Sequence, residues 1–301
     1  MTDAPTVSRP APRLDSIVIG LLALAAYAAV RQEVFYSVDA RLQILAAQRG
    51  DLFYTTHMLC TPLLWLAHRA LSPFGIEWFA IASWASAGGM ALGVALLHRA
   101  TVRLGLSRGR SALAAALIAT TPTVMFFASV AELHGPFFPA VGVAAMVFAG
   151  LLNHPTTRRA CWLGVAVGAS YLLHATGALM VGVFALLYGA LTPHAQSRWG
   201  RVRAAAWCGI LCGVVAATVA LGSAVLLRLF VDVPGARALR FLLSRPEGLM
   251  RLAQTPLVVA REWLLWCAPL AVLCFASVRS MRWRPLLTAL LLAIANNSTS
   301  T

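Results

Sequence analysis

Charged side chains are scarce in this sequence, and their scarcity excludes most classes of soluble protein. Only 11% of the 301 residues are charged, whereas 60% are hydrophobic, and the mean hydropathy is +0.78. A soluble domain has roughly 25% charged and about 45–50% apolar residues. The composition therefore excludes a soluble enzyme, a disordered chain and a fibrous protein, and it predicts a membrane protein.

Lysine is absent, and acidic residues are few. All 24 basic residues are arginine, against 10 acidic residues, and the formal net charge is +14. Such a charge can indicate nucleic-acid binding. Here, however, the arginines lie in short loops between apolar runs, where membrane topology explains them. We expect membrane lipids, and no nucleic acid, as partners.

The sequence also lacks C-x-x-C pairs and the G-x-G-x-x-G, P-loop and G-x-S-x-G motifs. Their absence removes the usual signals of nucleotide binding, hydrolase nucleophiles and thiolate metal sites. Five of the six cysteines lie in apolar runs, so we interpret them as apolar packing residues. The cysteines are Cys60, Cys161, Cys208, Cys212, Cys267 and Cys274.

Long apolar runs are what the sequence has in abundance. A span needs about 20 apolar residues, so the runs predict an all-α, polytopic transmembrane helix bundle of about eight or nine spans. We expect one membrane domain over residues 1–301. Within it, residues 231–256 form an outer loop and residues 257–301 form short C-terminal spans. The last run is too short to cross, so we expect a fragment or a truncated member of a longer family. The main runs are Leu14–Val30, Trp78–Leu97, Ser111–Ser129, Pro136–Leu152, Cys161–Leu173, Ala175–Leu191, Ala206–Phe230, Leu257–Val278 and Pro285–Ala295.

The distribution of arginine predicts the sidedness of these spans. The run His57–Leu71 is shorter than the others and is interrupted by Pro62. If it does not cross, 14 of the 24 arginines fall in inner loops, as the positive-inside rule requires. We therefore expect this run to lie along the outer interface, with the N-terminus inside, in the inner membrane of a bacterium.

The first outer loop contains the first candidate site residue. The sequence of this loop predicts an amphipathic interfacial helix that begins after Ser37 and ends at Gly50. Asp39 in its first turn fits two roles: a carboxylate favoured by the helix dipole, or a catalytic carboxylate on the outer membrane face. The expected apolar face consists of Val38, Leu42, Leu45 and Ala46, with Asp39 and Gln43 off it.

Further polar residues stand where apolar runs meet the outer side. His57 precedes an apolar run and is either an interfacial histidine or a donor to a phosphate. Glu132 and His134 would diverge on a helix, so a joint site requires the helix to end there, and Gly135-Pro136 favours that end. His174 either lines the same pocket or occupies a tight outer turn. Glu132 is either a polar helix terminus or a site acid, and the second role has equal weight because acids rarely enter membranes without a function.

The second outer loop is rich in arginine. Arginine forks suit phosphate, whereas snorkelling at the interface is the structural alternative for each single arginine. The four candidates are Arg237, Arg240, Arg245 and Arg251.

The order of these features resembles a known superfamily. An anchor span precedes an outer loop with an early Asp39 and a His57 before a Pro-containing run. A later span then runs from Thr120-Thr121-Pro122 to Ala131-Glu132-Leu133-His134. This is similar to the membrane-embedded C-type glycosyltransferases (GT-C), particularly bacterial relatives of protein mannosyltransferases and aminoarabinose transferases. The resemblance covers roughly residues 14–230.

The resemblance implies a sugar transfer from a polyprenyl-phosphate donor, with the site between outer loops and the membrane. It implies that Asp39 is the catalytic base, Glu132 the second outer acid and His57 a residue near the donor phosphate. The loop has Ser37-Val38-Asp39 rather than a D-x-D pair, which argues against a metal site, and position 134 is His where the family often has Tyr. We assign no cofactor.

Three functional hypotheses follow from the sequence. The first is a glycosyltransferase that transfers a sugar to a lipid, glycan or protein acceptor on the outer face. The second is a non-enzymatic transporter or lipid flippase, which would need polar groups at the bilayer midplane. The third is an inactive, truncated relative. The apolar interiors of the spans, with charges confined to their ends, favour the enzyme.

Overall fold

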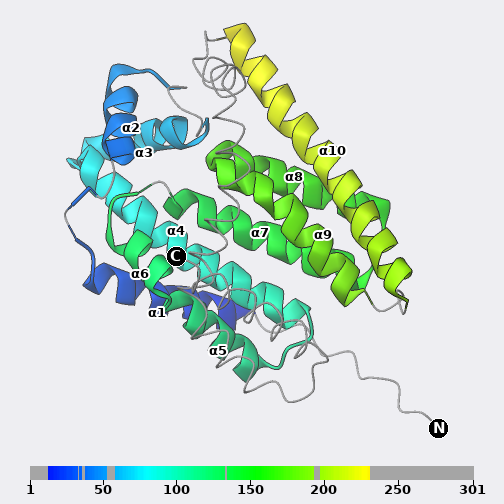
Figure 1. Ribbon diagram of the computed structural model, residues 1–301. Coiled ribbons are helices and arrows are strands. Elements are labelled where there is room, and N and C mark those ends of the chain that lie inside the picture. Colours follow the sequence, from blue (N-terminus) through cyan, green and yellow to red (C-terminus); the bar gives the residue numbers. More distant parts are fainter. Residues whose placement is uncertain are drawn as a thin grey trace, which may run out of the picture. The chain divides into compact units, whose positions relative to one another are not determined.

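The structure, a computed structural model, describes residues 13–32, 34–35, 38–52, 58–132, 134–192 and 197–230. These residues are helical, as predicted, and a lone bridge between Phe35 and Ala131 is the β-type pairing recorded among them (Figure 1). The helices are α1 (Arg13–Ala29), α2 (Val38–Arg49), α3 (Cys60–Leu71), η1 (Ser72–Phe74), α4 (Trp78–Arg103), α5 (Arg108–Ala119), α6 (Pro122–Ser129), α7 (His134–Asn153), α8 (Thr157–Leu173), η2 (Ala175–Ala178), α9 (Leu179–Leu191) and α10 (Arg198–Phe230).

Residue contacts divide the chain into two units. One unit contains Met1–Thr120 and Val124–Ala236, and the other contains Thr121–Thr123 and Arg237–Thr301. Nearly all described residues belong to the first unit, which the following paragraphs concern. The expectation of one domain over residues 1–301 stays a prediction.

Three helices are long and apolar enough to cross a membrane: α4, α7 and the Arg198–Ser223 part of α10. The pair α5–α6 makes a fourth if its two bent halves form one span. The chain is therefore a helical membrane protein. The predicted count of eight or nine spans is not confirmed, because α1, α8 and α9 have only 17, 17 and 13 residues. The runs Leu257–Val278 and Pro285–Ala295 lie outside the described residues.

Glycines let α4 and α7 approach closely. A Cβ atom on Gly89 would lie within 2.1 Å of the carbonyl oxygen of Gly135, and one on Gly93 within 2.3 Å of the ring of Phe138. Small residues four apart let helix backbones touch in membranes, where packing rather than the hydrophobic effect drives association. Figure 1 shows the two helices side by side. This contact sets the start of α7 against the third and fourth turns of α4.

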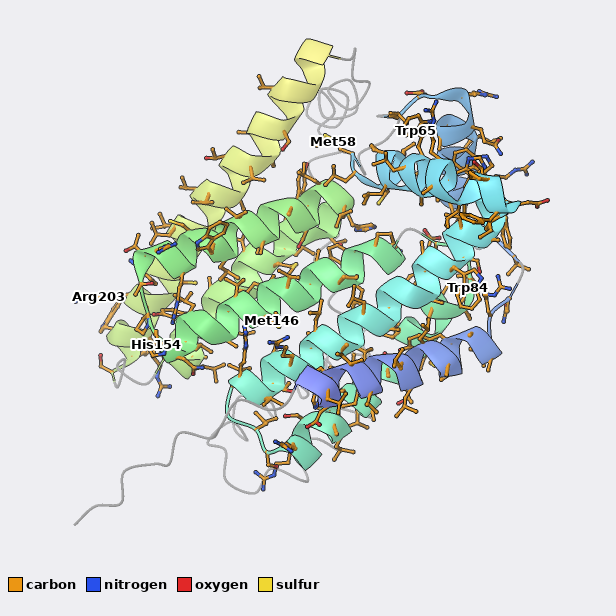
Figure 2. All side chains as sticks on the ribbon, turned by 180° about the vertical axis from the view of Figure 1, so that it is seen from behind. Met58, Trp65, Trp84, Met146, His154 and Arg203 are labelled. Carbon is orange, nitrogen blue, oxygen red and sulfur yellow. The ribbon has the colours of Figure 1, made fainter. Side chains whose placement is uncertain are left out.

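The helix ends gather at two ends of the first unit. Asn153 Nδ2 donates to the carbonyl of Arg103 at 2.9 Å, which joins the C-terminal ends of α7 and α4. At the other end Leu59 N donates to the carbonyl of Leu172 at 3.0 Å. Figure 2 shows the same separation, with Met58 and Trp65 at one end and His154 and Arg203 at the other. The loops expected inside thus share one end, and the first outer loop lies at the opposite one.

The predicted span Ser111–Ser129 is not one helix. It breaks into α5 and α6, which meet at an angle of 62°. The break precedes Pro122, and a proline disfavours the helical conformation of the residue before it. The hydroxyl of Tyr27 donates to the carbonyl of Ala119 at 3.0 Å and so satisfies a carbonyl that the ended helix leaves open.

The two helices of the first outer loop, α2 and α3, are short and do not cross the bundle. The stacked rings of His68 and Trp78, 3.8 Å apart, tie the end of α3 to the start of α4. The start of α3 is held by Leu172 at the same end of the unit. At 12 residues each, α2 and α3 are shorter than a membrane span, and their predicted place at the outer interface stays a prediction.

The face of α2 that packs inside the protein is not the predicted apolar face, with which it shares only Ala46 among the residues whose side chains are described. The buried residues of α2 are Ala40, Gln43, Ile44, Ala46 and Ala47. Leu42 and Leu45 are only partly buried, whereas Gln43 is 0% exposed. The reason is that α2 packs against α3 and α4, and helices approach each other best where alanines face the neighbour.

Candidate functional site

The site is built on a short extended segment, Val130–Glu132, between α6 and α7. Ala131 N donates to the carbonyl of Val34 at 3.3 Å, and Gln32 N donates to the carbonyl of Ser129 at 2.7 Å. The chain that leaves α1 therefore pairs with the chain that enters α7. This pairing satisfies backbone groups at a break where no helix can do so, and it fixes the direction of Glu132.

Ser86 of α4 holds the backbone of Glu132. Its hydroxyl donates to the carbonyl of Glu132 at 2.6 Å and accepts from the amide of Glu132 at 2.9 Å. Gly135, three residues on, lies so close that its Cβ would come within 2.3 Å of the Cα of Ser86. The position of Glu132 is thus determined by α4, and its side chain is only 5% exposed.

Glu132 lines an apolar cavity of about 220 Å³. Ala40 and Ile44 of α2 form part of its wall, so the first outer loop contributes to it. Of the lining residues, Glu132 is the charged one. A carboxylate in such surroundings is costly unless it is paired or bonded, which makes the cavity a candidate site. The remaining lining residues are Cys60, Leu63, Leu64, Ala67, Ile81, Ala82, Ala85 and Pro136.

Two histidines adjoin Glu132. Nδ1 of His134 lies 3.9 Å from Oε1 of Glu132. The ring of His134 stacks on Phe127 with centroids 4.1 Å apart, and it lies 4.4 Å from the ring of His174. Glu132, His134 and His174 therefore form one cluster, although 40 residues of sequence separate the two histidines.

Hydrogen bonds at the end of α8 position His174, the second histidine of the cluster. Nδ1 of His174 accepts from the amide of Thr176 at 3.3 Å and lies 2.7 Å from the Thr176 hydroxyl. An accepting Nδ1 carries no proton, so the neutral ring bears its proton on Nε2. His174 also caps α8, because its amide donates to the carbonyl of Ser170. The expected turn occurs, and His174 lies against the ring of His134. The cavity lined by Glu132 includes neither histidine among its lining residues, so their role in a pocket stays a prediction.

The helix break that a joint site required is present, but Gly135-Pro136 does not mark it. The preceding helix ends at Ser129, and α7 begins at His134. Gly135 and Pro136 lie in the first turn of α7, where a proline loses no hydrogen bond. The break lies earlier, at Val130–Glu132, where Ala131 pairs with Val34.

Cys60 belongs to this site, although the sequence suggested only a packing residue. Its thiol donates to the carbonyl of Leu173 at 3.2 Å. Burial raises the pKa of the Cys60 thiol to about 12, and the charge of Glu132 adds to the shift. Ser86 was also missed. The recurrence of small residues along Ser83, Ser86 and Gly89 is the sequence signal that indicates the face of α4 they occupy.

Asp39 is the second residue of α2, next to Ala40 of the cavity wall. Its side chain is outside the described part of the chain, so its catalytic role stays a prediction. Among the residues that the structure describes, no three His, Cys, Asp or Glu side chains are grouped to hold a metal ion. His57, Arg237, Arg240, Arg245 and Arg251 also lie outside the described residues.

The arrangement thus offers a shielded carboxylate, an apolar cavity and two neighbouring histidines at the end of the unit to which the first outer loop belongs. Comparison of the chain with protein-family models, with curated proteins and with solved structures found no match.

Proposed function

We propose that this protein is a multi-pass glycosyltransferase of the cell membrane. It transfers a sugar from a polyprenyl-phosphate donor to a lipid, glycan or protein acceptor on the outer face, with its N-terminus in the cytoplasm. The observation that carries the proposal is the buried carboxylate of Glu132 in the wall of an apolar cavity, beside His134 and His174. Ionisable groups at membrane depth mark functional sites by default.

The proposed reaction uses two carboxylates and a set of cations. The acceptor oxygen attacks the anomeric carbon of the sugar, and the bond from that carbon to the phosphate oxygen breaks with its electron pair on the phosphate. Asp39 takes the acceptor proton, and Glu132 is the second acid. His57 and one or more of Arg237, Arg240, Arg245 and Arg251 stabilise the leaving phosphate.

Replacement of Asp39 tests this function. Asp39→Asn keeps the size of the side chain, and a dipole-favoured aspartate would lose only about 0.3–1 kcal/mol of stability. A base loses its proton acceptor, so sugar transfer by purified protein should fall by about 10²-fold or more. Asp51→Asn is the matched control, because Asp51 follows Gly50 in an exposed turn and should retain nearly full turnover.

Near wild-type turnover of Asp39→Asn, with normal thermal stability, would show that Asp39 is only a helix-start residue. If stability and turnover are both lost, Arg237→Gln tests the same reaction through the leaving phosphate. It should lower turnover without changing the melting temperature.

One observation favours the second candidate, a transporter or lipid flippase. The α5–α6 pair is bent by 62° at its break, and transporters often build midplane sites from broken helices. Sugar transfer by detergent-solubilised protein, which has no sealed compartment, would exclude a pure transporter. It would also exclude an inactive relative.

A further inference from the structure

Apart from Glu132, the cavity described above is lined by apolar residues and one cysteine. Its other lining residues are Ala, Ile, Leu, Pro and Cys, and the Cys60 thiol is already engaged with the carbonyl of Leu173. Its volume of about 220 Å³ exceeds the ~150 Å³ at which an apolar cavity stays dry and binds benzene. A chain of several methylene groups therefore fits it better than water or a sugar ring, whose hydroxyls would find one acceptor group at most.

A second cavity continues the apolar path away from Glu132. It has a volume of about 400 Å³ and is more open. Three residues line both cavities: Ala67, Ile81 and Ala85. The two cavities are therefore adjacent along the contact between α3 and α4. Leu71, Ile76 and Trp84 form the rest of the second cavity's wall, so a long aliphatic chain meets no polar side chain along the path.

We infer that these two cavities bind a membrane lipid alcohol, with its hydroxyl donating to Glu132 and its hydrocarbon chain along α3 and α4. The complementarity is of two kinds. The walls match an aliphatic chain, and the single charged side chain matches a hydrogen-bond donor, because an ionised carboxylate only accepts. A lipid phosphate would instead meet the negative charge of Glu132 in a medium of low dielectric constant. The cavity therefore suits an acceptor and not a phosphate-linked donor.

The inference rests on the proposed function in one respect. It names the acceptor of that reaction as a lipid alcohol rather than a glycan or a protein. The binding itself adds no chemical step: the hydroxyl donates its hydrogen bond to Glu132 before the donor arrives, and it turns its O–H towards Asp39, the base that receives the proton during transfer. Ala40 of the cavity wall follows Asp39 directly in the chain, which places residue 39 of the backbone beside the same cavity.

Photolabelling in lipid nanodiscs tests the binding without any sugar donor. The probes are a saturated fatty alcohol with a mid-chain diazirine and its methyl ether, which has the same chain and no donor. A hydrogen bond to a charged acceptor is worth about tenfold or more. The alcohol should therefore label peptides of α3 and α4 about tenfold more strongly than the ether. Equal labelling by both probes, or alcohol labelling confined to other helices, would overturn the inference.

Two variants sharpen the test. Ala85→Phe fills the space that both cavities share and should reduce labelling at least fivefold, whereas Ala26→Phe, on the exposed face of α1, should not. Glu132→Leu should abolish the preference for the alcohol over the ether. Unchanged labelling in Ala85→Phe would refute the site even if Glu132→Leu fails to fold.

The outcomes separate the inference from the proposed function. Labelling that passes these tests, in a protein that transfers no sugar from any polyprenyl-phosphate donor, would refute the function and leave the lipid site. Sugar transfer to a water-soluble acceptor, with no alcohol labelling, would refute the lipid site and leave the function.

Discussion

At the scale of single residues, the site depends on how the backbone of Glu132 is held. Acid side chains are kept at membrane depth only where neighbouring groups fix them. Here Ser86 makes two hydrogen bonds to the backbone of Glu132, which fix the point from which its side chain leaves the main chain. His134, at the start of α7, lies beside the carboxylate, and His174, at the end of α8, lies against the ring of His134. The cluster thus forms because the start of α7 and the end of α8 lie side by side.

The thiol of Cys60 reports on this environment. Because burial, followed by the charge of Glu132, raises its pKa to about 12, the thiolate is nearly absent at pH 8. The thiolate is the reactive form, so alkylation by N-ethylmaleimide should be slow at pH 8 and should accelerate only as the pH approaches 12. Mass spectrometry of the Cys60 peptide measures the rate.

Glu132→Gln removes a charge that disfavours the thiolate, and so it should lower the pKa of Cys60 and speed alkylation at pH 8 severalfold. Glu77→Gln is the control, because Glu77 is exposed at the start of α4. Fast alkylation of the unaltered protein at pH 8 would contradict the buried placement of the thiol.

At the scale of helices, close packing of glycines sets the geometry of the site. Gly89 and Gly93 of α4 receive the start of α7, and Gly164 and Gly168 of α8 lie against Val215 and Val219 of α10. Backbones this close leave no room for a methyl group. The same contact that joins α4 and α7 brings Ser86 to the amide and carbonyl of Glu132. The close approach of these two helices therefore also positions the site.

Gly135→Ala should therefore destabilise the protein. Its Cβ would meet the Cα of Ser86 and the carbonyl of Ala85, which cannot move aside as a flexible side chain can. Overpacking of this kind costs about 1–3 kcal/mol, and the melting temperature in detergent should fall by several degrees. Gly150→Ala, in the same helix but with open space around its Cβ, should be neutral or slightly stabilising. Equal effects of the two variants would refute the close contact.

At the scale of the whole molecule, the ends of the helices separate by charge. Arg103 and Asn153 meet at one end of the first unit, and Asp15 of α1 lies 3.6 Å from Arg108 of α5. Glu132, His134 and the helices of the first outer loop lie at the other end. A bundle with basic loops at one end inserts with that end in the cytoplasm, which is the orientation we propose.

Cysteine labelling tests this orientation. With the native cysteines replaced by alanine, Ser37→Cys should react with a membrane-impermeant maleimide in intact cells. Ser107→Cys should react only after permeabilisation, because Ser107 precedes α5 beside the basic loop. Thr156→Cys, at the start of α8, is a second inner position and should behave like Ser107→Cys. Labelling of Ser107→Cys from outside would show that the bundle has the opposite orientation, with the Glu132 cluster on the cytoplasmic side.

The sequence by itself determined the class of the molecule and the positions of most helices. Apolar runs and their bounding residues suffice for this, because hydrophobicity and chain length decide which segments enter a bilayer. The helix that ends before Gly50 was also predicted, and the arginine distribution explains why the short run His57–Leu71 was not counted as a span. Pro122 within the run Ser111–Ser129 also signals a break, although that run was interpreted as continuous.

Only the tertiary structure decided which residues share a site. The face of α2 that is buried, the pairing of Ala131 with Val34 and the hydrogen bonds of Ser86 depend on contacts between segments about 50 to 100 residues apart. Sequence periodicity describes one helix at a time and contains no such pairing. Cys60 was therefore interpreted as a packing residue, and only the packing of α7 against α8 decided that His174 lies against His134. The physical reason is that close packing, which fixes these contacts, depends on the shapes of several helices at once.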